Sequence, residues 1–280
     1  MKDTPSTLFV SDMDGTLLDA QATLSPLSME LLNRAIAAGT MFTVATARTP
    51  ATVDVIMRGV DMRLPAIVMT GAAWWHFDSQ SYSHVKYMGA DNAAAVLAAF
   101  DRHGVVPFVY TLDTRKRPEK LSVYFSESTP SATDSSFIEQ RRHLPLKTFY
   151  IGETVSYDRL PYTVLFFASG MRDALRSVAE DISRATDCSV SVYDDIYNPG
   201  VGLIEVFGAG VSKANALTEL KRELGCDRLV VFGDNLNDLS MFAVADVSVA
   251  VGNALADVRK AADIVIGDNT SDAVPRYLLT

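Results

Sequence analysis

Short apolar runs alternate with helix-length segments up to about residue 80 of the chain. Three of these runs, Leu8–Val10, Met41–Ala45 and Ala66–Met69, are rich in β-branched or aromatic residues, and each is followed by small or polar residues. Such runs are typical of buried strands. The alternation predicts an α/β unit, with a parallel sheet and crossover helices.

Helix boundaries are marked between these strands. Ser25-Pro26 predicts a helix start, because Ser caps free amides and Pro suits the first turn, and Gly39 predicts the helix end. Thr49-Pro50 predicts a second helix that ends near Gly59.

The pattern changes over residues 84–197. Four strand-like runs occur in this stretch: Pro107–Tyr110, Leu121–Phe125, Thr163–Phe167 and Ser189–Tyr193. The first two flank a charged loop, residues 113–118, as in a hairpin. A hairpin favours an antiparallel sheet, so we expect an inserted α+β domain at 84–197.

After Asn198-Pro199-Gly200, which is interpreted as a linker, the parallel pattern resumes. Its strands are expected at Leu229–Phe232, Val247–Ala250 and Ile264–Ile266. The sequence therefore predicts a discontinuous core, residues 1–83 and 198–280, interrupted by the inserted domain.

The composition argues against some classes of binding partner. The chain has 280 residues, of which 48% are hydrophobic and 21% charged, and a formal net charge of -9. These are the proportions of a globular protein, and the acidic balance argues against a nucleic-acid or anionic-membrane partner. No segment has the length of a signal peptide or a membrane span, so a cytoplasmic location is expected. Cys188 and Cys226 are far apart and are expected to be thiols, outside any disulfide or zinc site.

Carboxylates gather at two predicted strand ends. Asp12 and Asp14 follow the first strand, and alternation would send both side chains to the same side. Asp234 and Asp238 follow the run that ends at Phe232. Since ligands bind at the carboxyl ends of parallel strands, we expect the four acids to meet in one crevice. A group of carboxylates without His or Cys suits Mg²⁺ and does not suit zinc.

Two further residues suit an anionic ligand. Thr46 ends the second predicted strand, where its hydroxyl can bind a phosphate oxygen. Lys213 follows Ser212, a predicted helix N-cap, and a lysine in the first helical turn opposes the helix dipole. An anion bound next to Lys213 would offset this unfavourable interaction with the helix dipole.

Together, Asp12–Thr16, Thr46, Lys213 and Gly233–Asp238 resemble the four motifs of the haloacid dehalogenase superfamily. The resemblance is specifically to the Cof-type phosphatases, which carry a large class IIB cap between the second and third motifs. The four motifs occur in the order and at the spacing of that family, and the resemblance covers the whole chain. It implies a Rossmann-like core with a parallel sheet, plus an inserted α+β cap domain.

The resemblance also implies residue roles. Asp12 would attack phosphorus to give an aspartyl-phosphate, and Asp14 would act as general acid and then as general base. The Mg²⁺ ligands would be Asp12, the carbonyl of Asp14 and Asp234. The phosphate would be bound by Thr46, Lys213 and Asn237, while Asp238 would orient Lys213 or the waters of the metal.

Four positions depart from the usual family pattern. Ala47, Ala214 and Ala273 stand where Gly is common, and Thr70 stands where Asn often precedes Gly71. These departures bear on loop shape, above all if position 47 requires a positive φ.

The expected function is Mg²⁺-dependent hydrolysis of a small phosphomonoester, such as a sugar phosphate, a phosphorylated cofactor or a nucleotide precursor. Two alternatives remain: a capped phosphomutase or phosphotransferase, and a catalytically silent binding or regulatory protein. A monomer or a small homo-oligomer is expected. The cap should determine specificity, and Arg115-Lys116-Arg117 is one candidate for binding a second anionic group.

Overall fold

The computed structural model describes residues 6–194 and 200–280. The chain forms two compact units, one of Met1–Ser83 with Ser212–Thr280 (unit 1) and one of His84–Val211 (unit 2). Unit 2 extends beyond the expected boundary at residue 198, because strand β11 (Val201–Phe207) pairs with strand β9 (Thr163–Met171) of unit 2. Asn198 and Pro199 of the predicted linker lie outside the described residues.

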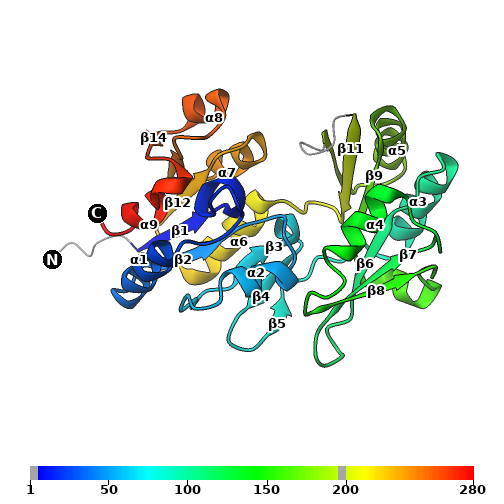
Figure 1. Ribbon diagram of the computed structural model, residues 1–280, viewed down its shortest axis with the longest axis horizontal. Helices are drawn as coiled ribbons and strands as arrows, with labels where there is room; N and C mark the ends of the chain where they lie inside the picture. The colour runs from blue at the N-terminus through cyan, green and yellow to red at the C-terminus, as the bar shows by residue number, and fades with distance from the viewer. Residues whose placement is uncertain (1–5, 195–199) are drawn as a thin grey trace. The chain divides into compact units, whose positions relative to one another are not determined.

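Unit 1 is built on a five-stranded parallel sheet with the order β14-β13-β12-β1-β2. Its strands are β1 (Thr7–Ser11), β2 (Met41–Val44), β12 (Arg228–Gly233), β13 (Val247–Ala250) and β14 (Ile264–Val265). Strands β1 and β12 come from opposite ends of the chain and lie side by side, with Phe9 opposite Val230 (Figure 1). The predicted parallel core is confirmed.

Helices connect and cover the strands of this sheet. They are α1 (Pro26–Ala37), α2 (Pro50–Ile56), α6 (Lys213–Leu224), α7 (Leu239–Phe242), α8 (Ala256–Ala261) and α9 (Ala273–Tyr277), with short 3-10 turns at Leu236–Asp238 and Asn269–Ser271. The predicted cap of α1 is confirmed, since the Ser25 side chain accepts a hydrogen bond from the Ser28 amide and Pro26 begins the helix. Ser212 caps α6 in the same way, accepting from the Asn215 amide.

The third predicted strand is present, but it pairs mainly with two strands that the sequence pattern did not predict. Strand β3 (Ala66–Val68) belongs to a separate antiparallel sheet with β4 (Ala73–His76) and β5 (Ser81–Ser83), and a single parallel bridge joins Ala45 to Ile67. The cause is the turn Met69–Gly71, whose three residues have φ of 50°, 57° and 97° and reverse the chain. A run of left-handed residues is rare outside Gly, so the sequence pattern gave no sign of this reversal.

Unit 2 has a mostly antiparallel six-stranded sheet with the order β10-β11-β9-β6-β7-β8. The strands are β6 (Phe108–Leu112), β7 (Leu121–Phe125), β8 (Lys147–Ile151), β9 (Thr163–Met171), β10 (Ser189–Asp194) and β11. The helices are α3 (Ala90–Arg102), α4 (Ala132–Glu139) and α5 (Arg172–Ala185), with a 3-10 segment at Tyr157–Tyr162. The hairpin of β6 and β7 is confirmed, and Phe100, Phe166 and Leu175 join helices and sheet in one core.

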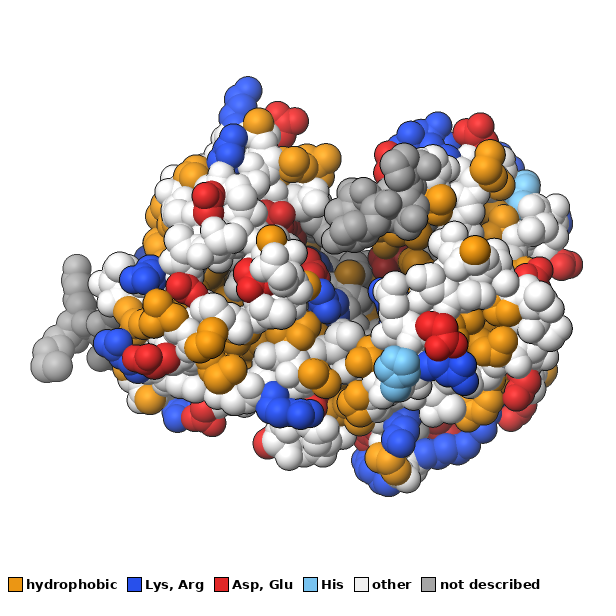
Figure 2. Space-filling view, viewed as in Figure 1, with side chains coloured by type: hydrophobic (Ala, Val, Ile, Leu, Met, Phe, Trp, Pro, Cys, Tyr) orange, Lys and Arg blue, Asp and Glu red, His pale blue; other side chains and the backbone are white. Residues whose placement is uncertain are grey.

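Charged side chains of both signs are mixed over the visible face of the molecule (Figure 2). None of the helices in the described ranges is long and apolar enough to cross a membrane.

Candidate active site

Asp12 and Asp14 follow the end of β1, and their side chains have different surroundings. The Asp12 amide donates to the Phe232 carbonyl (3.0 Å), which fastens this residue to β12, and its side chain is buried. The Asp14 side chain is 52% exposed. Strand alternation predicted that both carboxylates point the same way, but the strand ends at Ser11 and the chain then turns.

Gly15 allows this turn to approach the second acidic segment. Its φ is +75°, and a Cβ atom at this position would lie 2.4 Å from Oδ2 of Asp234. The Gly15 carbonyl accepts from the Asn253 side chain (2.7 Å), and the Thr16 hydroxyl donates to Oδ1 of Asp234 (3.0 Å). The turn after β1 thus packs directly on Asp234.

Gly15→Ala is expected to lower kcat/KM at least about tenfold, because the new Cβ displaces the Asp234 carboxylate. It should also cost about 1–2 kcal/mol of stability through its positive φ. Gly39→Ala is the matched control, since Gly39 has φ +99° with nothing within 4 Å of a Cβ. The control should lose stability and keep its activity. Equal activity in the two variants would contradict this role for Gly15.

Asp238 holds the second acidic turn together. It is fully buried, and its Oδ2 accepts from the backbone amides of Asp234 (3.0 Å) and Asn235 (3.1 Å). Its Oδ1 accepts from Nζ of Lys213 (3.1 Å). Both carboxylate oxygens are therefore occupied by partners from this chain.

Lys213 joins the two acidic turns. It is the first residue of α6, its side chain is 4% exposed, and Nζ donates to Oδ1 of Asp12 at 2.5 Å. Burial by itself lowers the pKa of Lys213, but the charges of Asp12 and Asp238 and their hydrogen bonds raise it above its ordinary value. Lys213 is therefore an ammonium ion with two carboxylate partners.

The carboxylates carry more negative charge than one lysine balances. Burial, together with the charges of Asp238 and Asp234, raises the pKa of Asp12 to about 7 against the opposing effect of Lys213. Burial and the charge of Asp238 raise the pKa of Asp234 to about 6. Carboxylates with raised pKa values at one place favour an added cation.

The donor atoms fit a hard divalent metal ion. One carboxylate oxygen from each of Asp12, Asp234 and Asp238 lies within 4.8 Å of the others, and this group contains no His or Cys. Both oxygens of Asp238 accept hydrogen bonds from this chain, and Asp238 does not line the pocket shared by Asp12 and Asp234, so these two are the side chains best placed to ligate an ion. Oxygen-only ligands suit Mg²⁺.

These residues border one pocket of about 110 Å³ in unit 1. Its lining residues are Asp12, Asp14, Thr46, Ala47, Lys213, Asp234, Asn235 and Asn237. Every site residue predicted from the sequence except Asp238 lines it. Thr46 is buried, and its hydroxyl accepts from the Arg48 amide (3.1 Å).

Sequence reasoning missed two residues that hold the turn after β1. Arg48 donates to both oxygens of Asp14, from Nε to Oδ2 (2.7 Å) and from Nη2 to Oδ1 (2.6 Å). Asn253 holds the Gly15 carbonyl. Arg48 is only two residues from Thr46, so it could have been predicted as a site residue from its position. Asn253 is distant along the chain, and nothing in the sequence pointed to it.

The departures from the family pattern have local explanations. Ala47 does not have a positive φ, so the loop does not require Gly there, and Ala214 and Ala273 lie in the first turns of α6 and α9. Thr70 does adopt the left-handed φ that Asn tolerates better. Gly71 is demanded by packing, because a Cβ there would lie 2.4 Å from the carbonyl oxygen of Ser212.

Comparison with known proteins identifies the family and agrees with the fold. The family model of haloacid dehalogenase-like hydrolases matches residues 9–278. Pyridoxal phosphate phosphatase YbhA of Escherichia coli is 26% identical over 279 residues, covering 95% of each chain. The 5-amino-6-(5-phospho-D-ribitylamino)uracil phosphatase YwtE of Bacillus subtilis is 25% identical over 281 residues, again covering 95% of each.

Solved structures show the same fold. A haloacid dehalogenase-like hydrolase from Bacteroides thetaiotaomicron superposes with a TM-score of 0.76 at 21% identity, covering 98% of both chains. A HAD subclass IIB sugar phosphatase gives a TM-score of 0.70 at 21% identity, with the same coverage.

The parallel sheet, the inserted second unit and the acid-lysine pocket define a hydrolase of the haloacid dehalogenase fold. The chain belongs to the haloacid dehalogenase-like hydrolases, since their model spans nearly its whole length. It is an enzyme of the Cof-type phosphatase group within that superfamily.

Proposed function

We propose that this chain is a Mg²⁺-dependent phosphatase that hydrolyses small phosphomonoesters through an aspartyl-phosphate on Asp12. The observation that carries the proposal is the ion pair between Lys213 Nζ and Oδ1 of Asp12, at 2.5 Å, in a pocket lined by Thr46 and Asn237. The ion pair fixes Asp12 and leaves its Oδ2 as the attacking atom.

The pocket residues bind the phosphoryl group. Lys213 supplies positive charge, and Thr46 and Asn237 supply polar groups at the pocket wall. In phosphoryl transfer, charge spreads over the phosphoryl oxygens, so positioning and charge neutralisation account for most of the catalysis. Lys213 is placed to do both.

Two displacement steps follow. Asp12 Oδ2 forms a bond to phosphorus as the ester P–O bond breaks, and Asp14 gives its proton to the leaving oxygen. Asp14 then takes a proton from water, the water oxygen bonds to phosphorus, and the bond between phosphorus and Asp12 breaks to release inorganic phosphate. The Arg48 pair must loosen for Asp14 to hold a proton, since Arg48 binds both of its oxygens.

Asp12, the main-chain carbonyl of Asp14 and Asp234 would hold the metal ion. Bound there, Mg²⁺ supplies positive charge for the carboxylates and the phosphoryl oxygens. The raised pKa values of Asp12 and Asp234 support this assignment.

A pH-dependent effect of Mg²⁺ on stability is expected. In the folded protein the pKa values of Asp12 (about 7) and Asp234 (about 6) exceed the ordinary 3.8. Without metal, the folded state binds more protons than the unfolded state in this range, so stability falls as pH rises from 3.8 to about 7. The Tm measured with a chelator should therefore fall between about pH 5 and pH 8, and Mg²⁺ should restore most of the loss. The same Mg²⁺ effect at both pH values would contradict this assignment.

The full-length relatives support a small phosphate ester as substrate. Their names specify pyridoxal phosphate and 5-amino-6-(5-phospho-D-ribitylamino)uracil, and one structural neighbour is a sugar phosphatase. We propose the same range of substrates for this chain: phosphorylated cofactors, their precursors and sugar phosphates.

Phosphate release from a panel of these esters tests the proposal, with Mg²⁺ and with a chelator. We expect saturable release that requires Mg²⁺. Transfer of phosphate to an added sugar instead of water would indicate a phosphotransferase. No release from any ester by folded protein would contradict the proposal.

A further inference from the structure

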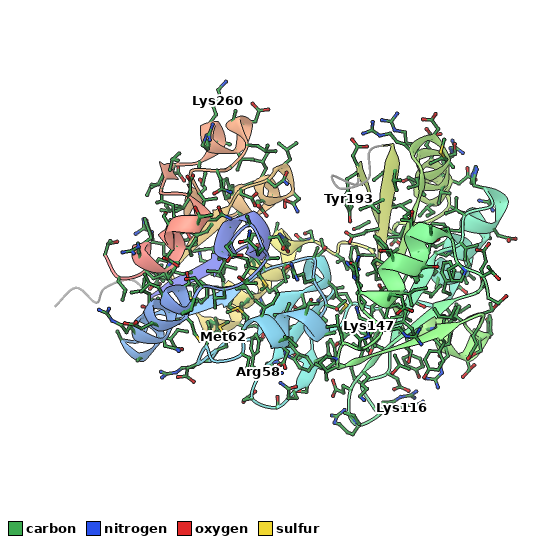
Figure 3. All side chains as sticks on the ribbon, in the orientation of Figure 1. Arg58, Met62, Lys116, Lys147, Tyr193 and Lys260 are labelled. Carbon is green, nitrogen blue, oxygen red and sulfur yellow. The ribbon has the colours of Figure 1, made fainter. Side chains whose placement is uncertain are left out.

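Unit 2 contains a buried lysine, Lys147, that has no carboxylate partner among the residues that the structure describes. Lys147 begins β8, at one edge of the six-stranded sheet, and is 8% exposed (Figure 3). Its Nζ lies 5.6 Å from the centre of the Tyr110 ring and 5.9 Å from that of Phe149. Over the described ranges, 6–194 and 200–280, no hydrogen bond or ion pair reaches this amine.

A second cationic side chain, Arg141, lies near enough to Lys147 to affect its pKa. Burial, and to a lesser extent the charge of Arg141, lowers the pKa of Lys147 to about 7. Arg141 lies just after α4, with its guanidinium 4.1 Å from the centre of the Phe137 ring, and donates to the Phe137 carbonyl (3.3 Å). Its guanidinium also donates to Oε1 of Gln140 (3.2 Å), so Arg141 adds positive charge near Lys147 while keeping partners of its own.

The other ionisable groups nearby do not supply the missing charge. Burial raises the pKa of Tyr110 above its ordinary value, so its hydroxyl stays neutral. Glu205 on β11 acts on Tyr110 but is not among the groups that shift the pKa of Lys147. A buried cation without an opposite charge is costly, and an anion that enters removes the cost.

The basic loop considered from the sequence is a weaker candidate. Arg115 Nε donates to Oδ1 of Asp113 at 2.8 Å, and Arg117 pairs with Glu119. The two arginines of this loop are thus already neutralised by acids of unit 2.

We propose that Lys147, with Arg141 beside it, is a binding site in unit 2 for an oxyanion, the carboxylate or phosphate group of a small molecule. The aromatic rings exclude water from the amine, which strengthens its attraction for an anion. The anion belongs either to the leaving portion of a phosphatase substrate or to a separate small molecule. Only the first of these rests on the proposed function.

The titration of Lys147 itself tests the site. In protein labelled with ¹³C at the lysine ε position, its resonance is the one missing from Lys147→Met, a variant that keeps an apolar chain of similar length. We expect its pKa, about 7 without anion, to rise by at least about one unit with saturating inorganic phosphate or succinate, a tenfold preference of the anion for the charged amine. Lys116, an exposed lysine of the same unit, should not shift. An unchanged titration of Lys147 with both probes would overturn the proposal.

A matched pair of esters then identifies the source of the anion. 3-Phosphoglycerate and glycerol 3-phosphate differ by a carboxylate in place of a hydroxymethyl group. If the anion is part of a substrate, Lys147→Met should lower the ratio of their kcat/KM values about tenfold, and Lys116→Met should not. An unchanged ratio with the titration shift intact assigns the site to a separate anion. If neither ester is hydrolysed, the titration still decides the proposal, so its failure is distinct from failure of the phosphatase assignment.

Discussion

Asp12→Asn is expected to lower kcat by about 10⁴-fold or more, because the nucleophile is lost. The amide oxygen can still accept the hydrogen bond from Lys213 that Oδ1 now accepts at 2.5 Å. Loss of a buried carboxylate also relieves the crowding with Asp234 and Asp238. The variant should therefore fold, with a Tm close to that of the wild type.

Initial rates of phosphate release and thermal unfolding check this prediction together. Asp19→Asn is the control, since Asp19 binds the backbone of its own turn, through the Thr23 amide, outside the acid-lysine pocket. The control should keep its kcat within a factor of about two. Turnover by Asp12→Asn at a rate close to that of the control would exclude Asp12 as the nucleophile.

Lys213→Met is expected to lower kcat/KM by about 10²–10³-fold, because the phosphoryl oxygens lose their charged partner. It should also destabilise the protein by about 3–5 kcal/mol, since Asp12 and Asp238 are left buried without a cation. The activity and the free energy of unfolding should fall together.

A second substitution separates these two effects. In Lys213→Met with Asp238→Asn, one uncompensated charge is removed, so part of the stability should return while the activity stays low. Lys221→Met is the control on the same helix, because Lys221 forms a partly exposed pair with Asp246. Recovery of activity along with stability would show that Lys213 acts only through folding.

The site residues that could be predicted were the charged residues at the ends of predicted strands and at the start of a predicted helix. Asp12 and Asp234 follow apolar strands, so their proximity followed from the parallel pairing of β1 with β12. Lys213 was noticeable because a cation opposes the dipole of its helix. These signals are local in the sequence and need no knowledge of distant partners.

The errors arose where a distant partner or a backbone angle decides the outcome. β11 belongs to unit 2 because it pairs with β9 and β10, which its own residues do not reveal. β3 pairs antiparallel with β4 because Met69 and Thr70 take positive φ and reverse the chain after it. The pairing of Asp14 with Arg48 was not predicted either, because it depends on a turn that begins after the strand ends at Ser11.

The same limit applies to Lys147. In the sequence it is one lysine at the start of a strand, and the charged loop at 115–117 is the more conspicuous basic feature. Only the folded chain shows that the loop arginines have acidic partners while Lys147 is buried between aromatic rings.

Trapping the covalent intermediate tests the central claim most directly. Asp14→Asn should form the aspartyl-phosphate from p-nitrophenyl phosphate, whose leaving group needs no proton, and should hydrolyse it slowly without a general base. After acid quench and proteolysis, mass spectrometry should find phosphate on the peptide that contains Asp12, and none when Asp12→Asn is added. Release of nitrophenol with no phosphate on Asp12 at any time before steady state would contradict the mechanism.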